Sequence, residues 1–166
     1  MFRLVSDFST AWEQESANTV RLLAALTDAS LSRSMDDQGR TLGKLAWHLV
    51  ETLPEMLPSA GLSLDFTLTS EHPPESAGEI ATAYAKGARL LGEAVAAQWS
   101  DADLLEETDM YGMRWKRGFT LQCLIVHQAH HRGQMTVLMR QAGLPVPGMV
   151  GPSREEWVAM GAPAPE

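Results

Sequence analysis

Apolar side chains recur every three or four residues along four long stretches of the chain, and this spacing predicts four amphipathic helices. The first stretch carries Phe8, Trp12, Leu22 and Leu26 at nearly helical intervals. The predicted helices cover about residues 4–27, 42–57, 76–99 and 119–142.

Residues typical of helix ends mark several of these boundaries. Thr41 is a predicted N-cap for the second helix, and Ser76 with Glu79 forms a capping-box pattern before the third. Gly143 stands where a helix-ending glycine belongs, just after the fourth. Pro54 falls inside the second helical pattern, so we expect a kink or an early end there.

The connections between the helices suggest how they are arranged. Residues 59–75 contain glycine and proline but little periodicity, and a connection this long would let the second and third helices run parallel. Around Tyr111–Gly112 we expect an irregular segment or a small hairpin, and no strand pattern is strong enough to support a sheet. The sequence therefore predicts an all-α four-helix bundle, as one domain over residues 1–166.

Charge and composition exclude some classes of partner. The 166 residues carry 13 basic and 21 acidic side chains, a formal net charge of -8 that would repel a nucleic acid. No apolar stretch approaches the roughly 20 residues that span a bilayer, so we expect no membrane partner. A single cysteine, Cys123, rules out an internal disulfide and suits the cytoplasm, as does an N-terminus without a signal-peptide pattern.

Three of the five histidines point to a metal site. His127 and His131 are four residues apart, so they lie about 6 Å apart along the axis and about 40° apart around it. Alone, such a pair could equally be two partly buried histidines satisfied by hydrogen bonds. His48 lies within the apolar second helix and would also face the bundle interior. Three histidine ligands leave at least one coordination position open for water or substrate.

Two known metal-site patterns do not match. A zincin motif needs glutamate after its first histidine, where this chain has Gln128. A di-iron bundle needs several glutamates and Glu-x-x-His pairs, whereas this chain has the reverse order, His48-x-x-Glu51, once. Imidazole ligands suit a divalent transition metal, with zinc or nickel preferred and iron, manganese and copper left open.

Residues 124–157 resemble the C-terminal signature of the DinB-like superfamily, with His-x-x-x-His, Arg-Gly-Gln and a Pro-Gly turn. Residues 41–51 resemble the helix that carries the first histidine of that family. The resemblance implies an up-down-down-up bundle, with a long crossover between the second and third helices. It also implies metal ligation by His48, His127 and His131 and frequent homodimers. Characterised relatives include bacillithiol and mycothiol transferases and a thiol-dependent maleylpyruvate isomerase. The family name reflects induction by DNA damage, a stress response, and does not imply DNA binding.

Five further residues are candidates for the site. Glu51 could accept a hydrogen bond from His48 or act as a general base, and Gln134 could orient a ligand. Arg117 and Arg132 could hold a substrate carboxylate, and Trp47 could line a pocket. The alternatives are a solvated helix residue for Glu51, packing for Gln134 and Trp47, and surface salt bridges for the arginines.

These features give three functional hypotheses. In the first, an open metal site binds a low-molecular-weight thiol as thiolate, which attacks an electrophilic small molecule; the thiol comes from the resemblance. In the second, metal-bound hydroxide hydrolyses a substrate. In the third, the protein is a non-catalytic metal-binding stress or sensor protein.

Overall fold

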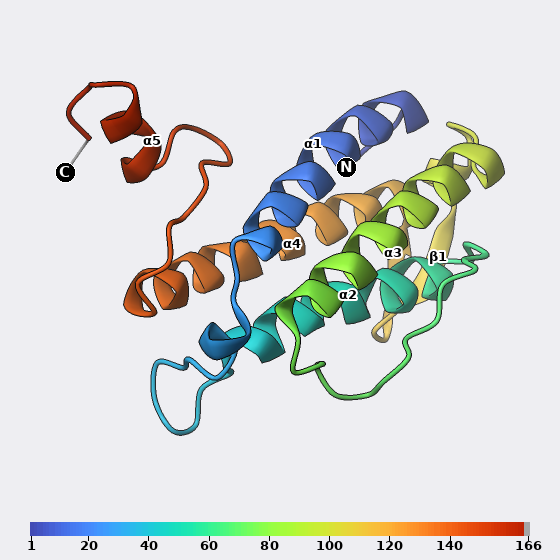
Figure 1. Ribbon diagram of the computed structural model, residues 1–166. Helices are drawn as coiled ribbons and strands as arrows, with labels where there is room; N and C mark the ends of the chain where they lie inside the picture. The colour runs from blue at the N-terminus through green and yellow to red at the C-terminus, as the bar shows by residue number, and fades with distance from the viewer. Residues whose placement is uncertain (165–166) are drawn as a thin grey trace.

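Four long helices lie side by side in the computed structural model, which describes residues 1–164 (Figure 1). They are α1 (Val5–Ala24), α2 (Leu42–Ser59), α3 (Ala77–Gln98) and α4 (Arg117–Gln141). The shorter elements are η1 (Asp28–Ser30), η2 (Asp103–Leu105), β1 (Glu107–Met110), β2 (Met113–Lys116) and α5 (Arg154–Ala159), and α5 stands apart from the bundle. The predicted all-α bundle is confirmed.

Contacts between helix ends define the chain directions. The side chain of Gln98, at the end of α3, donates to the carbonyl of Ser63, just beyond the end of α2, so α2 and α3 run the same way. The amide of Phe2, before α1, donates to the carbonyl of Gly118, at the start of α4, so these two helices are also parallel. Figure 1 shows α1 and α4 running opposite to α2 and α3. The long segment between α2 and α3 carries the chain back along the bundle, so that α3 starts at the same end as α2.

The predicted helix ends are found in the structure. The Thr41 hydroxyl accepts from the amide of Lys44 at 3.2 Å, and the Ser76 hydroxyl accepts from the amide of Glu79 at 3.4 Å. Gly143 follows α4 with a φ of 73°, the left-handed conformation that glycine adopts without strain. These local signals fix where α2 and α4, the two helices that carry the histidines, begin or end.

Pro54 does not end α2, so the predicted early end is wrong. The helix continues to Ser59 although proline cannot donate to the preceding turn, a loss of about 3 kcal/mol. The residues around it are fully or almost fully buried: Leu53, Met56 and Leu57. Each such side chain contributes roughly 1.5–3 kcal/mol on burial, so packing outweighs the local penalty.

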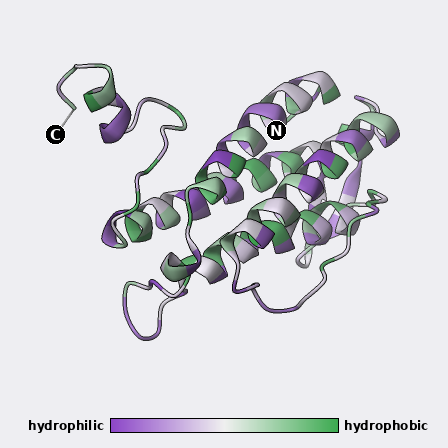
Figure 2. Ribbon diagram, in the orientation of Figure 1, coloured by the Kyte–Doolittle hydropathy of each residue, from purple (hydrophilic) through white to green (hydrophobic). Residues whose placement is uncertain are grey.

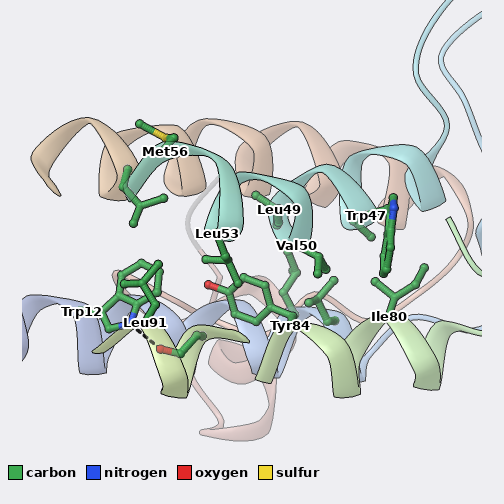
Figure 3. Close-up of a cluster of buried hydrophobic side chains, with 14 of the residues drawn as sticks. Trp12, Trp47, Leu49, Val50, Leu53, Met56, Ile80, Tyr84 and Leu91 are labelled. Atoms are coloured by element: carbon green, nitrogen blue, oxygen red, sulfur yellow. Dashed lines mark hydrogen bonds between the residues drawn. The ribbon is translucent and has the colours of Figure 1, made fainter. Parts of the chain in front are cut away.

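The core lies between the four helices. Figure 2 shows apolar and polar segments alternating along each helix, as expected where one face turns inward. In Figure 3, Tyr84 and Leu91 of α3 face Leu53 of α2, and the Trp12 indole of α1 donates to the Ala88 carbonyl at 2.9 Å. Among the described residues, no helix combines the length and apolar character that a bilayer crossing needs.

A two-stranded hairpin joins α3 to α4, which settles the alternative left open between Tyr111 and Gly112. Strands β1 and β2 pair antiparallel, with Met110 opposite Met113. Both turn residues have positive φ, 53° at Tyr111 and 78° at Gly112, as in the tight turns that suit twisted hairpins. The Tyr111 hydroxyl donates to a carboxylate oxygen of Glu55 on α2 at 3.0 Å. This bond fixes the hairpin against the end of α2.

Candidate metal centre

Three imidazoles meet where α2 packs against α4. One nitrogen each of His48, His127 and His131 lies within 4.8 Å of the other two. The Nε2 atoms of His127 and His131 are 3.1 Å apart, and the ring of His48 is centred 5.0 and 4.7 Å from their rings. A tetrahedral ion with bonds of about 2.0–2.1 Å holds its ligand nitrogens roughly 3.3 Å apart. The spacing therefore fits three ligands to one ion.

Gln128 fixes the two helices in the register that this arrangement needs. Its fully buried amide nitrogen donates to the Leu49 carbonyl at 3.2 Å and to the Thr52 hydroxyl at 3.1 Å, both on α2. Leu49 directly follows His48, and Gln128 directly follows His127. The residue that rules out a zincin motif thus aligns the two histidine-bearing helices.

Two of the histidine rings have a polar side chain beside their Nδ1 atom. Nδ1 of His131 lies 2.7 Å from the side-chain oxygen of Gln134, which can only accept, so Nδ1 carries the proton and Nε2 keeps its lone pair. Nδ1 of His48 lies 3.4 Å from a carboxylate oxygen of Glu51. Partners of this kind hold metal-binding imidazoles in the ligating tautomer. Glu51 and Gln134 therefore both lie beside candidate ligands.

His127 supplies the test of whether an ion fits. Its Nδ1 is buried and has no hydrogen-bond partner among residues 1–164. Its Nε2 points at the Nε2 of His131, which already presents a lone pair. Two converging lone pairs repel each other unless a proton or a cation lies between them. A transition-metal ion between the two rings would bind the Nε2 lone pairs of His127 and His131. The donor set of the cluster therefore fits a transition-metal ion.

Burial keeps the three rings neutral. It is the main reason why the pKa values of His48 and His131 fall below the ordinary 6.5, and it lowers the pKa of His127 to about 4. Positive charge on the neighbouring histidines lowers the pKa of His127 further. At neutral pH all three imidazoles are therefore in the unprotonated form that binds metal.

Glu55 of α2 and Tyr111 of the hairpin form a second polar pair, two helical turns along α2 from His48. The negative charge of Glu55 acts to raise the pKa of both His48 and His127. Burial, and then the bond to Glu55, raises the pKa of Tyr111 to about 12, so the phenol stays protonated and Glu55 accepts. Glu55 was not among the sequence candidates. Its position two helical turns after His48 is the signal that could have found it.

The other candidates lie elsewhere. Arg132 is buried and pairs with the carboxylate of Glu15 on α1. Arg117 donates to Glu106 at 2.6 Å, near the hairpin. Trp47 is 2% exposed, and its ring points toward α3 (Figure 3). The structure does not bring these three side chains to the histidines.

Two further residues lie close to the ligands in sequence. His130 is exposed, with its ring centred 4.9 Å from that of His131. Cys123, four residues before His127, is half-buried, and burial raises the pKa of its thiol. That thiol therefore stays protonated at neutral pH and is a poor nucleophile.

Comparison with known proteins places the chain in a family. The family model of the DinB family matches residues 1–164. The uncharacterized protein YrdA of Bacillus subtilis (strain 168) is 41% identical over 166 residues, which are 100% of this chain and 99% of that protein.

Solved structures agree with the sequence match. A DinB-like protein from Bacillus cereus ATCC 10987 superposes with a TM-score of 0.85 at 41% identity, covering 89% of this chain and 99% of that one. The DinB-like protein YjoA from Bacillus subtilis has a TM-score of 0.65 at 18% identity, covering 84% and 96%, and shares the fold. The chain belongs to the DinB family.

Proposed function

We propose that this protein is a metal-dependent enzyme that transfers a low-molecular-weight thiol to an electrophilic small molecule. The observation that carries the proposal is the convergence of three neutral imidazoles, from His48, His127 and His131, on one point. Three protein ligands leave a coordination position for a reactant, as in catalytic rather than closed structural sites. The family and the histidine cluster support metal dependence; the thiol chemistry is the further step of the proposal.

Each residue of the cluster has a role in this scheme. His48, His127 and His131 would hold the ion; Gln134 orients the ring of His131, and Glu51 lies beside that of His48. When bound, a zinc or nickel ion would stabilise a thiolate at neutral pH, as would iron, manganese or copper to differing degrees. Glu55, held by Tyr111, would accept the thiol proton as the thiol becomes a thiolate, before the sulfur attacks the electrophile. The nucleophile comes from outside, because the Cys123 thiol stays protonated.

Cobalt-substituted protein tests the proposal directly. Sulfur ligation gives a charge-transfer band in the near ultraviolet, so titration with bacillithiol, mycothiol or glutathione should produce that band with at least one thiol. Cys123→Ser should leave the band intact, which assigns the sulfur to the added thiol. If no thiol changes the spectrum although water exchange shows an open position, thiol transfer is excluded, and hydrolysis or non-catalytic metal binding takes its place.

Hydrolysis is the second candidate, and the position of Glu55 favours it. A carboxylate beside His48 and His127 could accept a proton from water as readily as from a thiol. Glu55→Gln should then abolish turnover of activated esters without changing metal content. Hydrolysis without any added thiol would select this alternative.

We also propose that the enzyme is a cytoplasmic homodimer. Two apolar side chains of α4 are exposed at 40% and 58%: Phe119 and Val126. They are seven residues apart, close to two helical turns, so they share one outward face. A two-fold pairing through such a face would bury both. The single cysteine suits a reducing compartment.

A further inference from the structure

A cavity of about 540 Å³ lies against the outer side of the histidine cluster. His131 and Gln134 form one wall, so the cavity shares a side chain with the candidate metal centre. Its apolar walls come from Leu45 of α2, Val137 of α4 and Met35 of the loop before α2. The size is typical of small-molecule sites.

Arg40 is the charged group of this cavity. It lies in the loop between η1 and α2, and among the described residues no acidic side chain lines the cavity with it. Within residues 1–164 its guanidinium has no ion pair or side-chain hydrogen bond, whereas Arg114, Arg117, Arg132 and Arg140 each pair with a carboxylate. An arginine without a protein partner at the wall of a cavity is available to a ligand.

Arg40 and His131 line the same cavity, together with Gln134. The guanidinium therefore borders the space beside one of the candidate ligands. Just before Arg40 the loop makes a tight turn, in which the Asp36 carboxylate accepts from the amides of Gln38 and Gly39 at 2.9 and 2.5 Å.

We infer that this cavity binds a substrate with an apolar body and one carboxylate, and that Arg40 recognises the carboxylate. The guanidinium matches a carboxylate in shape and can bind it through two parallel hydrogen bonds. A single cation balances a monoanion, whereas a phosphate dianion would call for a second cation, which this cavity lacks among the described residues. The apolar body would lie on Leu45 and Val137, with its reactive end toward the far side of His131. The inference rests on the proposed function, because it names the substrate class of that site.

A pair of neutral and charged probes tests this inference without thiol chemistry. Fluorine NMR would follow the binding of 4-fluorophenylacetate and of 4-fluorophenylacetamide to the zinc-loaded protein. We expect the carboxylate to bind about three- to tenfold more tightly than the amide, the range for a partly exposed charged hydrogen bond. Arg40→Gln should remove this preference, Arg40→Lys should keep part of it, and Arg3→Gln should keep all of it. Arg3 is the matched control because it is exposed and lies before α1, away from the cavity.

Several outcomes would overturn the inference. Equal binding of the two probes would show that Arg40 does not select a carboxylate. A carboxylate preference that survives in Arg40→Gln would show the same, and is the result expected if the carboxylate binds directly to zinc. Tighter, Arg40-dependent binding of 4-fluorophenyl phosphate would replace the carboxylate with a phosphate. Zinc content and circular dichroism of each variant must match those of the wild type. A carboxylate preference without any thiol band in the cobalt protein would refute thiol transfer alone, and the reverse result would refute this inference alone.

Discussion

The side-chain oxygen of Gln134 lies 2.7 Å from Nδ1 of His131, and this contact decides which nitrogen of His131 is free to bind a metal ion. Gln134→Leu should therefore weaken zinc affinity about tenfold, the lower end of the range for lost partners of metal-binding histidines. Competition with a chromophoric chelator measures this affinity.

The conservative change Gln134→Glu separates orientation from packing. A carboxylate also accepts from Nδ1, so this variant should keep zinc affinity near the wild-type value. Equal weakening in both variants would mean that Gln134 does not act through the ring of His131.

The three histidines should all be needed for metal binding. His48→Ala, His127→Ala and His131→Ala each remove one of three ligands, so zinc content after purification without chelators should fall from about one ion per chain to almost none. His130→Ala is the control, since its exposed ring lies next to His131 in sequence. Full zinc affinity in His48→Ala, or wild-type protein without any divalent metal, would contradict the site.

Burial of the histidines should make the metal-free protein sensitive to mild acid. The pKa of His127 is about 4 in the folded protein and about 6.5 in the unfolded chain. The unfolded chain therefore takes up protons first, and stability present above pH 6.5 is lost as the pH falls toward 4. Urea unfolding between about pH 7 and pH 5 should show a loss on the order of 1 kcal/mol. His127→Asn should reduce this loss, and an unchanged pH dependence would contradict the assignment.

Arg132 should contribute to stability rather than to ligand binding. It is buried and donates to the carboxylate of Glu15 and to the hydroxyl of Thr19, the latter at 2.8 Å. Arg132→Met leaves the Glu15 carboxylate buried without a cation, so it should cost about 3–5 kcal/mol in urea unfolding. Adding Glu15→Leu should recover most of this loss, because an apolar pair can replace a buried ion pair. A small effect of Arg132→Met alone would show that the pair is not buried.

The proposed dimer depends on the outward face of α4. Val126→Glu introduces a charge on that face and should convert the dimer to a monomer in light scattering at micromolar concentration. Val150→Glu is the control, because Val150 is 99% exposed and lies outside α4. A monomeric wild-type protein would exclude the dimer.

The local signals of this sequence predict where its helices begin and end, but they do not predict the contacts between distant parts of the chain. Thr41, Ser76 and Gly143 act on the residues next to them, so their roles could be predicted. Pro54 also acts locally, but the packing of Leu53 and Leu57 against distant helices outweighs its effect. That packing has no signature near Pro54 in the sequence.

The candidate site shows the same division. The spacing of His127 and His131 puts them on one face of a helix, but only the packing of α2 on α4 adds Glu55 beside them. Arg40 lies in a loop without periodicity, so the sequence does not indicate which side chains surround it. The sequence therefore could not show that Arg40, rather than Arg117 or Arg132, is the arginine without a protein partner within residues 1–164. The hydrogen-bond partners of those arginines, found only in three dimensions, make the difference.

His48 and His127 are 79 residues apart (127 − 48), and the chain between them runs through α3 and the hairpin. An ion shared by His48, His127 and His131 would therefore act as a cross-link that closes a long loop. An ion that binds only the folded state stabilises it by a free energy that rises with the logarithm of the free ion concentration. Metal starvation would then do more than stop the chemistry: it would shorten the lifetime of the protein against proteases, so its abundance would follow the supply of metal in the cell.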